Sequence, residues 1–264
     1  MQCRFIDTGF NDAYTNMAVD EALLNCCEIP TLRIYGWKPA ISIGYSQNIQ
    51  KEINLEECKR LNIGIVRRIT GGKAVYHDKE LTYSFILPEN TNLLPKDITE
   101  SYRLIANALV LAIKKIGIKA EIKNQVEKFL TPICFNSSNW YELAVNNKKI
   151  SGSAQRRFNG KILQHGPILM DFDHEKNALL FNSNNEMDNS NNLKKRITSL
   201  KDELRKNISY GELAEALKYG FKENFNFNIF EDSLTEEEKT FAERLRKEKY
   251  STEEWNYRLL TKTI

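Results

Sequence analysis

The spacing of apolar residues along the chain predicts four helices. The clearest runs from Thr99 to Ile116, where apolar side chains recur every three or four residues and Gly117 stands where the helix would end. The other three run from Asn11 to Asn25, from Ile208 to Glu223 and from Thr235 to Lys249. Near the end of the chain, two pairs of residues have the spacing of a capping box: Thr235 with Glu238, and Ser251 with Glu254.

Short apolar runs bounded by Gly, Pro or polar residues predict β-strands between these helices. Four precede the central helix: Leu32–Tyr35, Ile41–Tyr45, Ile63–Ile69 and Leu81–Leu87. Three follow it and are joined by Asn146-Asn147 and Asn159-Gly160: Tyr141–Val145, Lys148–Ala154 and Ile162–Met170. Both dipeptides tolerate the positive φ of a tight hairpin, so we predict an antiparallel meander. Because strands and helices do not alternate regularly, the predicted fold class is α+β rather than a doubly wound sheet.

One segment has almost nothing to bury. From Asn182 to Asn192, six of eleven residues are Asn, which is typical of an exposed, mobile loop. We therefore expect one domain over residues 1–264, with a mobile loop near 182–196 and a helical C-terminal segment over 197–264.

Composition and charge narrow the class of protein. The chain has 264 residues, and its 38 Lys and Arg against 35 Asp and Glu leave a formal charge of +3 that is scattered along the sequence. This scatter argues against a nucleic-acid partner. No run approaches the roughly 18 apolar residues of a membrane span, and residues 1–22 carry five charges in place of the apolar core of a signal peptide. We expect a cytoplasmic protein with no membrane partner.

The cysteines and histidines argue against a metal site. Five cysteines show no CxxC spacing, which fits reduced thiols better than a disulfide framework or a zinc site. The chain has three histidines, His77, His165 and His174, which makes a multi-histidine metal centre unexpected.

The densest chemical motif runs from Arg67 to Asp78. Two arginines leave a predicted strand, and Gly71 and Gly72 would let the backbone approach a ligand closely, since glycine has no Cβ. This pattern predicts a cradle for an acyl group or for a phosphate-bearing carrier. From spacing alone, a Gly-Gly turn flanked by solvated arginines fits as well.

A second group of chemically capable residues lies between Cys134 and His165. It contains Lys149, the run from Gly152 to Gln155, and Gln164-His165-Gly166. Each residue also has a simpler structural interpretation. Cys134 next to an aromatic residue is typical of a small buried side chain, Lys149 of a solvated strand lysine, and His165 of a hydrogen-bonded interior residue.

Several motifs together resemble the lipoate-protein ligase and octanoyltransferase family. They occur in this order: Asn16 to Leu23, Arg33 to Trp37, Ser42 to Gln47, Arg67 to Asp78, Lys149 to Gln155, Gln164 to Gly166, Lys249-Tyr250 and Trp255-Asn256. The resemblance covers nearly the whole chain except the Asn-rich segment. It implies the biotin/lipoate protein ligase catalytic fold, with an antiparallel-rich mixed sheet flanked by helices. Biotinylation is not expected, because the GRGRxG signature of biotin ligases is absent.

The resemblance also implies roles for individual residues. Cys134 resembles the acyl-accepting cysteine of the octanoyltransferase branch, whose members load octanoyl groups onto the glycine cleavage H protein. Lys149 would lower the pKa of this thiol by favouring the thiolate. The substrate would contact seven further residues: Arg68, Thr70, Gly71, Gly72, His77, Gly152 and His165.

The implied reaction moves an octanoyl group from acyl carrier protein to a lysine of the H protein or of another lipoyl domain, with no metal or cofactor. Steering of acidic partners is one interpretation of five basic residues, and a solvated face is the other. These residues are Arg67, Arg68, Lys73, Arg156 and Arg157.

Three other functions remain open at this point. An ATP-dependent lipoate ligase would use Gly71-Gly72 and Lys149 to hold an adenylate phosphate, and Cys134 would be a bystander. Such ligases usually carry an accessory domain, and a chain that ends at Ile264 is expected to lack one. A lipoyl-domain amidotransferase would also use a cysteine. The third possibility is a carrier-binding module without catalysis.

Overall fold

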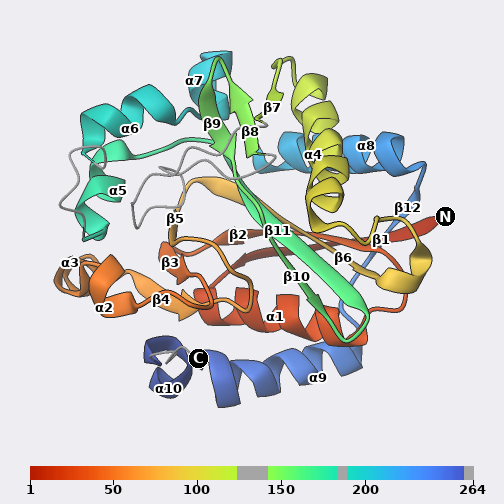
Figure 1. Cartoon of the computed structure of the whole chain (residues 1–264), viewed down its shortest axis with the longest axis horizontal. Helices are drawn as coiled ribbons and strands as arrows, with labels where there is room; N and C mark the ends of the chain where they lie inside the picture. Colours follow the sequence, from red (N-terminus) through yellow and green to blue (C-terminus); the bar gives the residue numbers. More distant parts are fainter. Residues whose placement is uncertain (124–141, 183–188, 259–264) are drawn as a thin grey trace.

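The fold is built on a large mixed β-sheet. The computed structural model describes residues 1–123, 142–182 and 189–258, and within these ranges nine strands form one sheet in the order β12-β1-β2-β6-β11-β9-β8-β7, with β10 paired to β11 (Figure 1). The strands are β1 Gln2–Asn11, β2 Thr31–Trp37, β6 Glu80–Pro88, β7 Glu121–Lys123, β8 Glu142–Val145, β9 Lys148–Ser151, β10 Ala154–Phe158, β11 Lys161–Leu169 and β12 Asn228–Asp232. Parallel pairing joins β1 to β2 and to β12, and the other pairs of this sheet are antiparallel.

A smaller sheet holds the glycine-rich motif. It has the order β4-β3-β5, with β3 Ala40–Ile43, β4 Gly64–Arg67 and β5 Val75–His77. Two short helices, α2 Ile49–Glu52 and α3 Leu55–Arg60, connect β3 to its parallel neighbour β4. The motif from Arg67 to Asp78 is therefore the connection that leaves β4, turns, and returns as β5.

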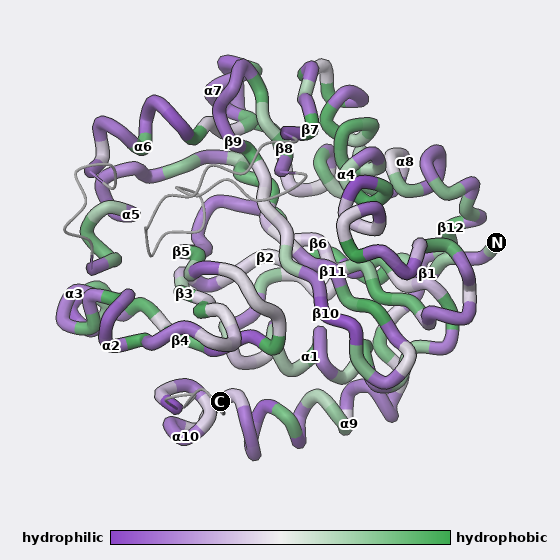
Figure 2. Tube along the Cα trace, in the orientation of Figure 1, coloured by the Kyte–Doolittle hydropathy of each residue, from purple (hydrophilic) through white to green (hydrophobic). Residues whose placement is uncertain are grey.

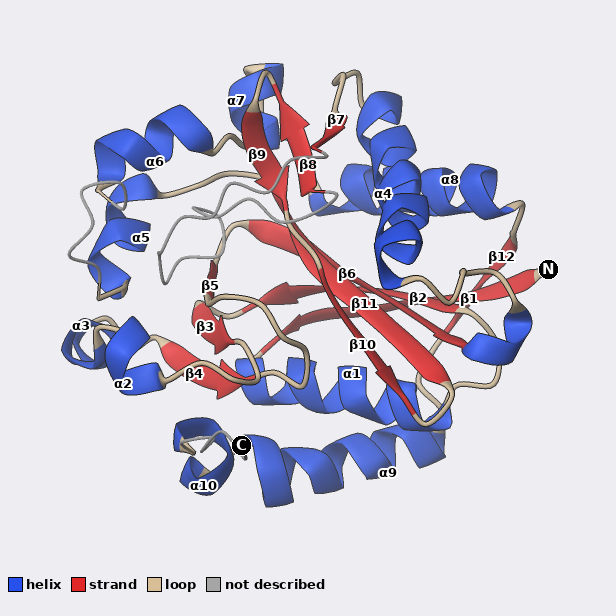
Figure 3. Cartoon of the chain, in the orientation of Figure 1, coloured by secondary structure: helices blue, strands red, loops and turns tan. Residues whose placement is uncertain are grey.

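Helices cover both faces of the large sheet (Figure 3). On one face, α4 Ile98–Lys115 packs against α8 Tyr210–Phe225, and on the other face α1 Ala13–Cys26 packs against α9 Glu236–Leu245. The chain then forms a π-helical turn, Arg246–Tyr250, and α10 Glu253–Tyr257. The other helices within the described residues are η1 Glu89–Thr91, α5 His174–Leu180, α6 Ser190–Arg196 and α7 Leu200–Leu204. Over the described residues, none of these helices has the length and apolar character to cross a membrane.

The alternation of side chains along the central strands separates two cores. In β6, Tyr83 and Phe85 face the core beneath α4 and α8, whereas Ile86 packs in the core beneath α1. Figure 2 shows the hydrophobic residues concentrated in α4 and the central strands, while α6 is mostly hydrophilic. On the α1 side, Thr82 and Ser84 of β6 make polar contacts that belong to the site described below.

Most of the predicted strands and helices are confirmed. The four helices predicted from periodicity correspond to α1, α4, α8 and α9, and the strands predicted before the central helix correspond to β2, β3, β4 and β6. Both hairpin turns have positive φ, with 49° and 64° at Asn146 and Asn147, and 48° and 70° at Asn159 and Gly160. The strand predicted over Lys148–Ala154 is interrupted, because β9 ends at Ser151 and β10 begins at Ala154.

Three predictions about the end of the chain are wrong in part. The loop predicted near 182–196 ends earlier, because Asn189 caps α6 and the apolar face of this helix buries Leu193 completely; residues 183–188 lie outside the described part. The segment predicted as helical over 197–264 also contains the edge strand β12. The capping box at Thr235 and Glu238 is confirmed, but Thr252 caps α10 in place of Ser251.

Two glycines of α8 offer a test of the packing between α4 and α8. A Cβ at Gly220 would overlap the carbonyl oxygen of Ala108, whereas a Cβ at Gly211 would meet no atom within 4 Å. We expect Gly220→Ala to lower the free energy of unfolding by about 1–3 kcal/mol, because the helices must separate. Gly211→Ala should be neutral or stabilising by up to about 1 kcal/mol, because alanine favours a helix. Urea denaturation measures both, and an equal effect of the two substitutions would contradict the close contact.

Candidate active site

A cavity lies between the small sheet, α1, and the strands β2, β6, β10 and β11 of the large sheet. Its volume is about 450 Å³, including the part that opens to solvent. Apolar and aromatic side chains, among them Met17, Trp37 and Val75, form much of its wall. Of the residues predicted to contact substrate, the cavity brings together Arg68, Gly72, His77, Gly152 and His165.

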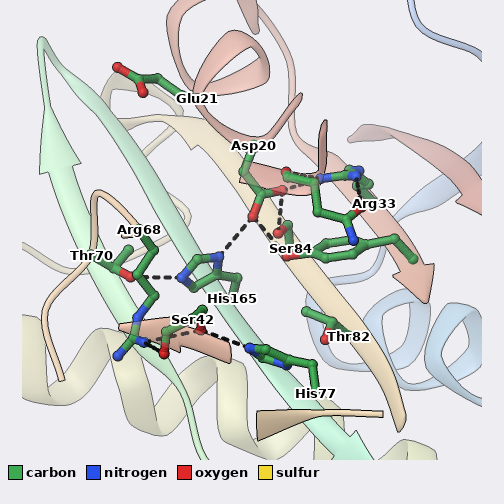
Figure 4. Close-up of polar contacts among 12 residues, drawn as sticks. Asp20, Glu21, Arg33, Ser42, Arg68, Thr70, His77, Thr82, Ser84 and His165 are labelled. Carbon is green, nitrogen blue, oxygen red and sulfur yellow. Dashed lines mark hydrogen bonds and ion pairs between the residues drawn. The ribbon is translucent and has the colours of Figure 1, made fainter. Parts of the chain in front are cut away.

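A buried carboxylate on α1 organises one wall of the cavity (Figure 4). Asp20 is 1% exposed. Its Oδ1 accepts hydrogen bonds from Arg33 and from Ser84 Oγ at 2.7 Å, and its Oδ2 accepts from Tyr35 Oη at 2.9 Å and from His165 Nδ1 at 2.8 Å. Burial alone would raise the pKa of Asp20, but Arg33 and His165 lower it, so the group is a carboxylate.

His165 links this carboxylate to the glycine-rich turn. Its Nε2 lies 2.7 Å from Thr70 Oγ1, while Nδ1 faces Asp20. Burial lowers the pKa of His165 although Asp20 opposes the change, and the positive charge of Arg68 lowers it further. The neutral ring therefore donates from Nδ1 to Asp20 and accepts from the Thr70 hydroxyl at Nε2.

His77 forms a second chain of the same kind. Its Nδ1 lies 2.6 Å from Glu80 Oε1 and its Nε2 lies 2.7 Å from Ser42 Oγ. The ring stacks on Trp37 at a centroid distance of 3.8 Å and an interplanar angle of 8°. Both ring nitrogens of His77 and both of His165 are thus bound by neighbouring side chains. An apolar group can lie against these rings without leaving a ring nitrogen unpaired.

Arg68 holds the glycine-rich turn by its backbone. Its guanidinium donates to the carbonyl oxygens of Ser42 at 3.0 Å, Gly71 at 2.8 Å and Lys73 at 2.7 Å. Gly72 has φ of +91°, and a Cβ at Gly44 would overlap the Gly72 carbonyl oxygen. Glycine is therefore required at both positions. Of the residues predicted to form a cradle, Arg68 and Gly72 line the cavity, Thr70 is buried against His165, and Gly71 is exposed.

Arg67 and Arg68 are not the steering charges that the sequence allowed. They are 0% and 4% exposed, because both guanidinium groups are used to bind backbone carbonyls inside the protein. Arg67 donates to the carbonyl oxygens of these six residues: Gly44, Tyr45, Gln47, Trp255, Asn256 and Arg258. Burial and the neighbouring Arg258 lower the pKa of Arg67 to about 10. Lys73, Arg156 and Arg157 are partly exposed.

Of the predicted pair of Lys149 and Cys134, the structure describes only Lys149. Lys149 is 5% exposed, and its Nζ donates to Glu142 Oε1 at 2.6 Å. A Cβ at Gly152 would lie 3.0 Å from the same Nζ, so the lysine sits directly behind a cavity-lining glycine. Cys134 lies outside the described residues, and its role stays a prediction. The ion pair of Lys149 with Glu142 was not predicted, because the sequence does not show which carboxylate faces the lysine.

The four cysteines in the described part of the chain do not compete for this role. Cys3, Cys26, Cys27 and Cys58 are free. Burial raises the pKa of Cys3 to about 12 and that of Cys27 and Cys58 to about 11, which disfavours the thiolate. Among the described residues, no group of three His, Cys, Asp or Glu side chains is placed to hold a metal ion.

The chain is similar to known proteins over nearly its whole length. The model of the lipoyl protein ligase A/B catalytic domain matches residues 12–222. Octanoyltransferase LipM of Geobacillus kaustophilus is 40% identical, and that of Bacillus subtilis is 39% identical; each alignment covers 97% of this chain and 98% of the relative.

Solved structures of ligases share the fold, which confirms the predicted fold class. Lipoate-protein ligase A bound with ATP has a TM-score of 0.85 and 28% identity over 98% of this chain and 100% of that one. A putative lipoate protein ligase of Thermoplasma acidophilum with bound lipoic acid has a TM-score of 0.82 and 28% identity, with the same coverage.

The Asp20 network can be tested by removing its charge. Asp20→Asn leaves the fully buried Arg33 without its carboxylate, and we expect a loss of about 3–5 kcal/mol in the free energy of unfolding. Adding Arg33→Met should recover part of this loss, since the uncompensated cation is then gone. Glu21→Gln, on the same helix, removes a partly exposed ion pair with Lys249 and should cost about 1 kcal/mol or less. Denaturation that showed equal losses for Asp20→Asn and Glu21→Gln would contradict the network.

The histidines make stability depend on pH. Because the fold lowers the pKa of His165, and burial also lowers that of His174, the unfolded chain binds more protons just below the ordinary pKa of 6.5. The free energy of unfolding should therefore decrease as pH falls from about 7.5 through 6.5 toward the lower folded-state values. Urea denaturation at several pH values measures how steeply the free energy of unfolding changes with pH. His165→Gln should make this slope smaller and leave the contribution of His174. A slope that is the same in the variant would overturn this assignment.

Proposed function

The chain belongs to the lipoyl protein ligase A/B catalytic domain family, and on this premise we propose that it moves an octanoyl group from acyl carrier protein to a lysine of the glycine cleavage H protein or of another lipoyl domain. The protein is an acyltransferase of protein lipoylation. The observation that carries this function is its identity of about 40% to octanoyltransferases over nearly their whole length. We place the reaction in the cytoplasm.

The cavity suits a medium acyl chain. Each buried methylene contributes roughly 0.8 kcal/mol, so six contribute on the order of 5 kcal/mol, enough to select octanoyl over acetyl. Discrimination against one methylene more or fewer is weak. Trp37, which stacks on His77, gives this wall an apolar surface, and the ring nitrogens of His77 and His165 are bound by neighbouring side chains.

The proposed chemistry has two steps. The Cys134 thiolate attacks the thioester carbonyl of octanoyl carrier protein, which forms an S-octanoyl enzyme and releases the carrier thiolate. The neutral amine of the acceptor lysine then attacks this thioester, loses a proton, and expels the Cys134 thiolate as the amide forms. Lys149, held by Glu142, would stabilise the thiolate in both steps.

The other functions differ in what they require. A lipoate ligase needs ATP to activate a free acid, and the ligases that share the fold are 28% identical to this chain. An amidotransferase would take the acyl group from one lipoyl domain and transfer it to another. A binding module would form no covalent adduct.

Intact-protein mass spectrometry separates these functions. After mixing with octanoyl carrier protein and no ATP, we expect the protein to gain the mass of one octanoyl group, and Cys134→Ala to gain none. Cys26→Ala is the matched control, because Cys26 is partly exposed, and it should still be acylated. An H protein acceptor should then discharge the adduct.

Two results would contradict the proposal. If no adduct forms without ATP, but the acceptor is modified once ATP and free octanoate or lipoate are supplied, the protein is a ligase. If the adduct forms only from an octanoylated lipoyl domain, the protein is an amidotransferase.

A further inference from the structure

A larger cavity, the outer cavity, adjoins the substrate cavity on the side of α4. Its volume is about 670 Å³, including the part that opens to solvent, and its walls include the exposed residues Ile98 and Thr99 at the start of α4. Three residues line both cavities: Gly72, Ser153 and Ala154. Of these three, Ser153 alone carries a polar side-chain atom. A Cβ at Gly166 would lie 3.0 Å from Ser153 Oγ, so this hydroxyl lies directly beside a glycine of the substrate cavity.

The function proposed above brings the thioester carbonyl to the place where the two cavities meet. The acyl chain has no polar group, which suits the substrate cavity beside Trp37. The thioester arm of a carrier protein contains neutral amides. The outer cavity offers hydroxyl and amide groups without a charge, from Thr99, Tyr102 and Gln155. The carbonyl joins the chain to the arm, so it lies next to Ser153.

A chain of hydrogen bonds that runs in one direction orients the hydroxyl of Ser153. Arg157 can only donate, and its Nε donates to Gln155 Oε1 at 3.4 Å. This contact turns the amide nitrogen of Gln155 toward Gln164, where it donates to Oε1 at 2.9 Å. Gln164 then presents its own Nε2, which donates to Tyr83 Oη at 3.0 Å. Arg157 therefore fixes the donor and acceptor ends of both amides.

Tyr83 continues this direction to Ser153. Its side chain is fully buried, and burial raises the pKa of Tyr83 to about 12, so the phenol keeps its proton. Because Tyr83 Oη accepts from Gln164, the acceptor of the phenol proton is Ser153 Oγ, 2.7 Å away; the opposite direction would leave a buried O–H unpaired. The proton of Ser153 is then available, and no group within residues 1–123, 142–182 and 189–258 accepts it.

Resting on the function proposed above, we propose that Ser153 donates a hydrogen bond to the carbonyl oxygen of the acyl thioester. When the Cys134 thiolate attacks, the new S–C bond forms and the electron pair of the C=O bond moves onto oxygen, where the Ser153 hydroxyl stabilises the negative charge. The pair returns as the carrier thiolate leaves, and Ser153 keeps its proton throughout. Ser153 is a catalytic residue, and Tyr83, Gln164 and Gln155 are positioning residues.

Binding of two unreactive analogues tests the hydrogen bond. Both derive from the octanoyl thioester of N-acetylcysteamine: in the ketone a methylene replaces the sulfur, and in the thioether a methylene replaces the carbonyl group. Titration calorimetry on the Cys134→Ala protein avoids addition of the thiol to the ketone. In this background, we expect Ser153→Ala to weaken binding of the ketone about fivefold and to leave that of the thioether nearly unchanged. Ser153→Thr, which keeps the hydroxyl, should bind the ketone as the parent does.

Ser151→Ala is the matched control for this measurement. Ser151 is a buried serine two residues away, but its hydroxyl donates to the carbonyl oxygen of Pro167 at 2.7 Å. Its removal should leave the ratio of the two affinities unchanged. Tyr83→Phe removes the group that orients Ser153 and should lower the ratio less than Ser153→Ala does. A ratio that is the same with and without the Ser153 hydroxyl would overturn the proposal.

The rate of acylation tests the catalytic role. With the octanoyl thioester of N-acetylcysteamine as donor and Cys134 in place, Ser153→Ala should slow formation of the S-octanoyl enzyme about 100-fold, followed by mass spectrometry. Equal rates for the wild type and the variant would overturn the catalytic role, even where the ketone binds through Ser153. A wild-type protein that forms no adduct, while Ser153 still distinguishes the ketone from the thioether, would contradict the transferase function alone.

Discussion

The buried carboxylate of Asp20 is the interaction on which the rest of the site depends. A charge this far from water is stable only if every lone pair that faces the interior is satisfied, and Asp20 takes its donors from three strands. Arg33 and Tyr35 come from β2, Ser84 from β6 and His165 from β11. The position of α1 against the sheet and the orientation of the His165 ring are therefore set by the same carboxylate.

Two buried arginines hold the glycine-rich turn in place. Arg67 and Arg68 bind backbone carbonyls from the turn, from the segment after β3 and from the end of the chain, so a conformation that has few side-chain contacts of its own becomes fixed. Close approach of Gly44 to Gly72 completes the cradle. Because charged donors bind carbonyls more strongly than neutral donors do, two buried arginines suffice to order this loop.

These contacts also explain what could be predicted from the sequence. Periodicity predicts α4 because one face of this helix is buried, and the positive φ at Asn159 and Gly160 follows from residue type. The edge strand β12 was not predicted, because its residues are largely exposed and show no apolar pattern. It is a strand because it pairs with β1. The motif identifies the residues of the cradle, but it does not show that Arg67 is buried, because backbone carbonyls carry no sequence signal.

An octanoyl chain has no charge, so burial is the interaction that would hold it, and burial acts only at short range, once the chain has entered the cavity. The polar groups of the cavity wall must then be bound by the protein itself, because a buried donor left without a partner costs about 1–3 kcal/mol. Arg68 meets this condition by donating to the carbonyl oxygens of Ser42, Gly71 and Lys73, and His165 meets it through Asp20 and Thr70. The contacts that order the glycine-rich turn therefore also prepare the cavity wall for an apolar group.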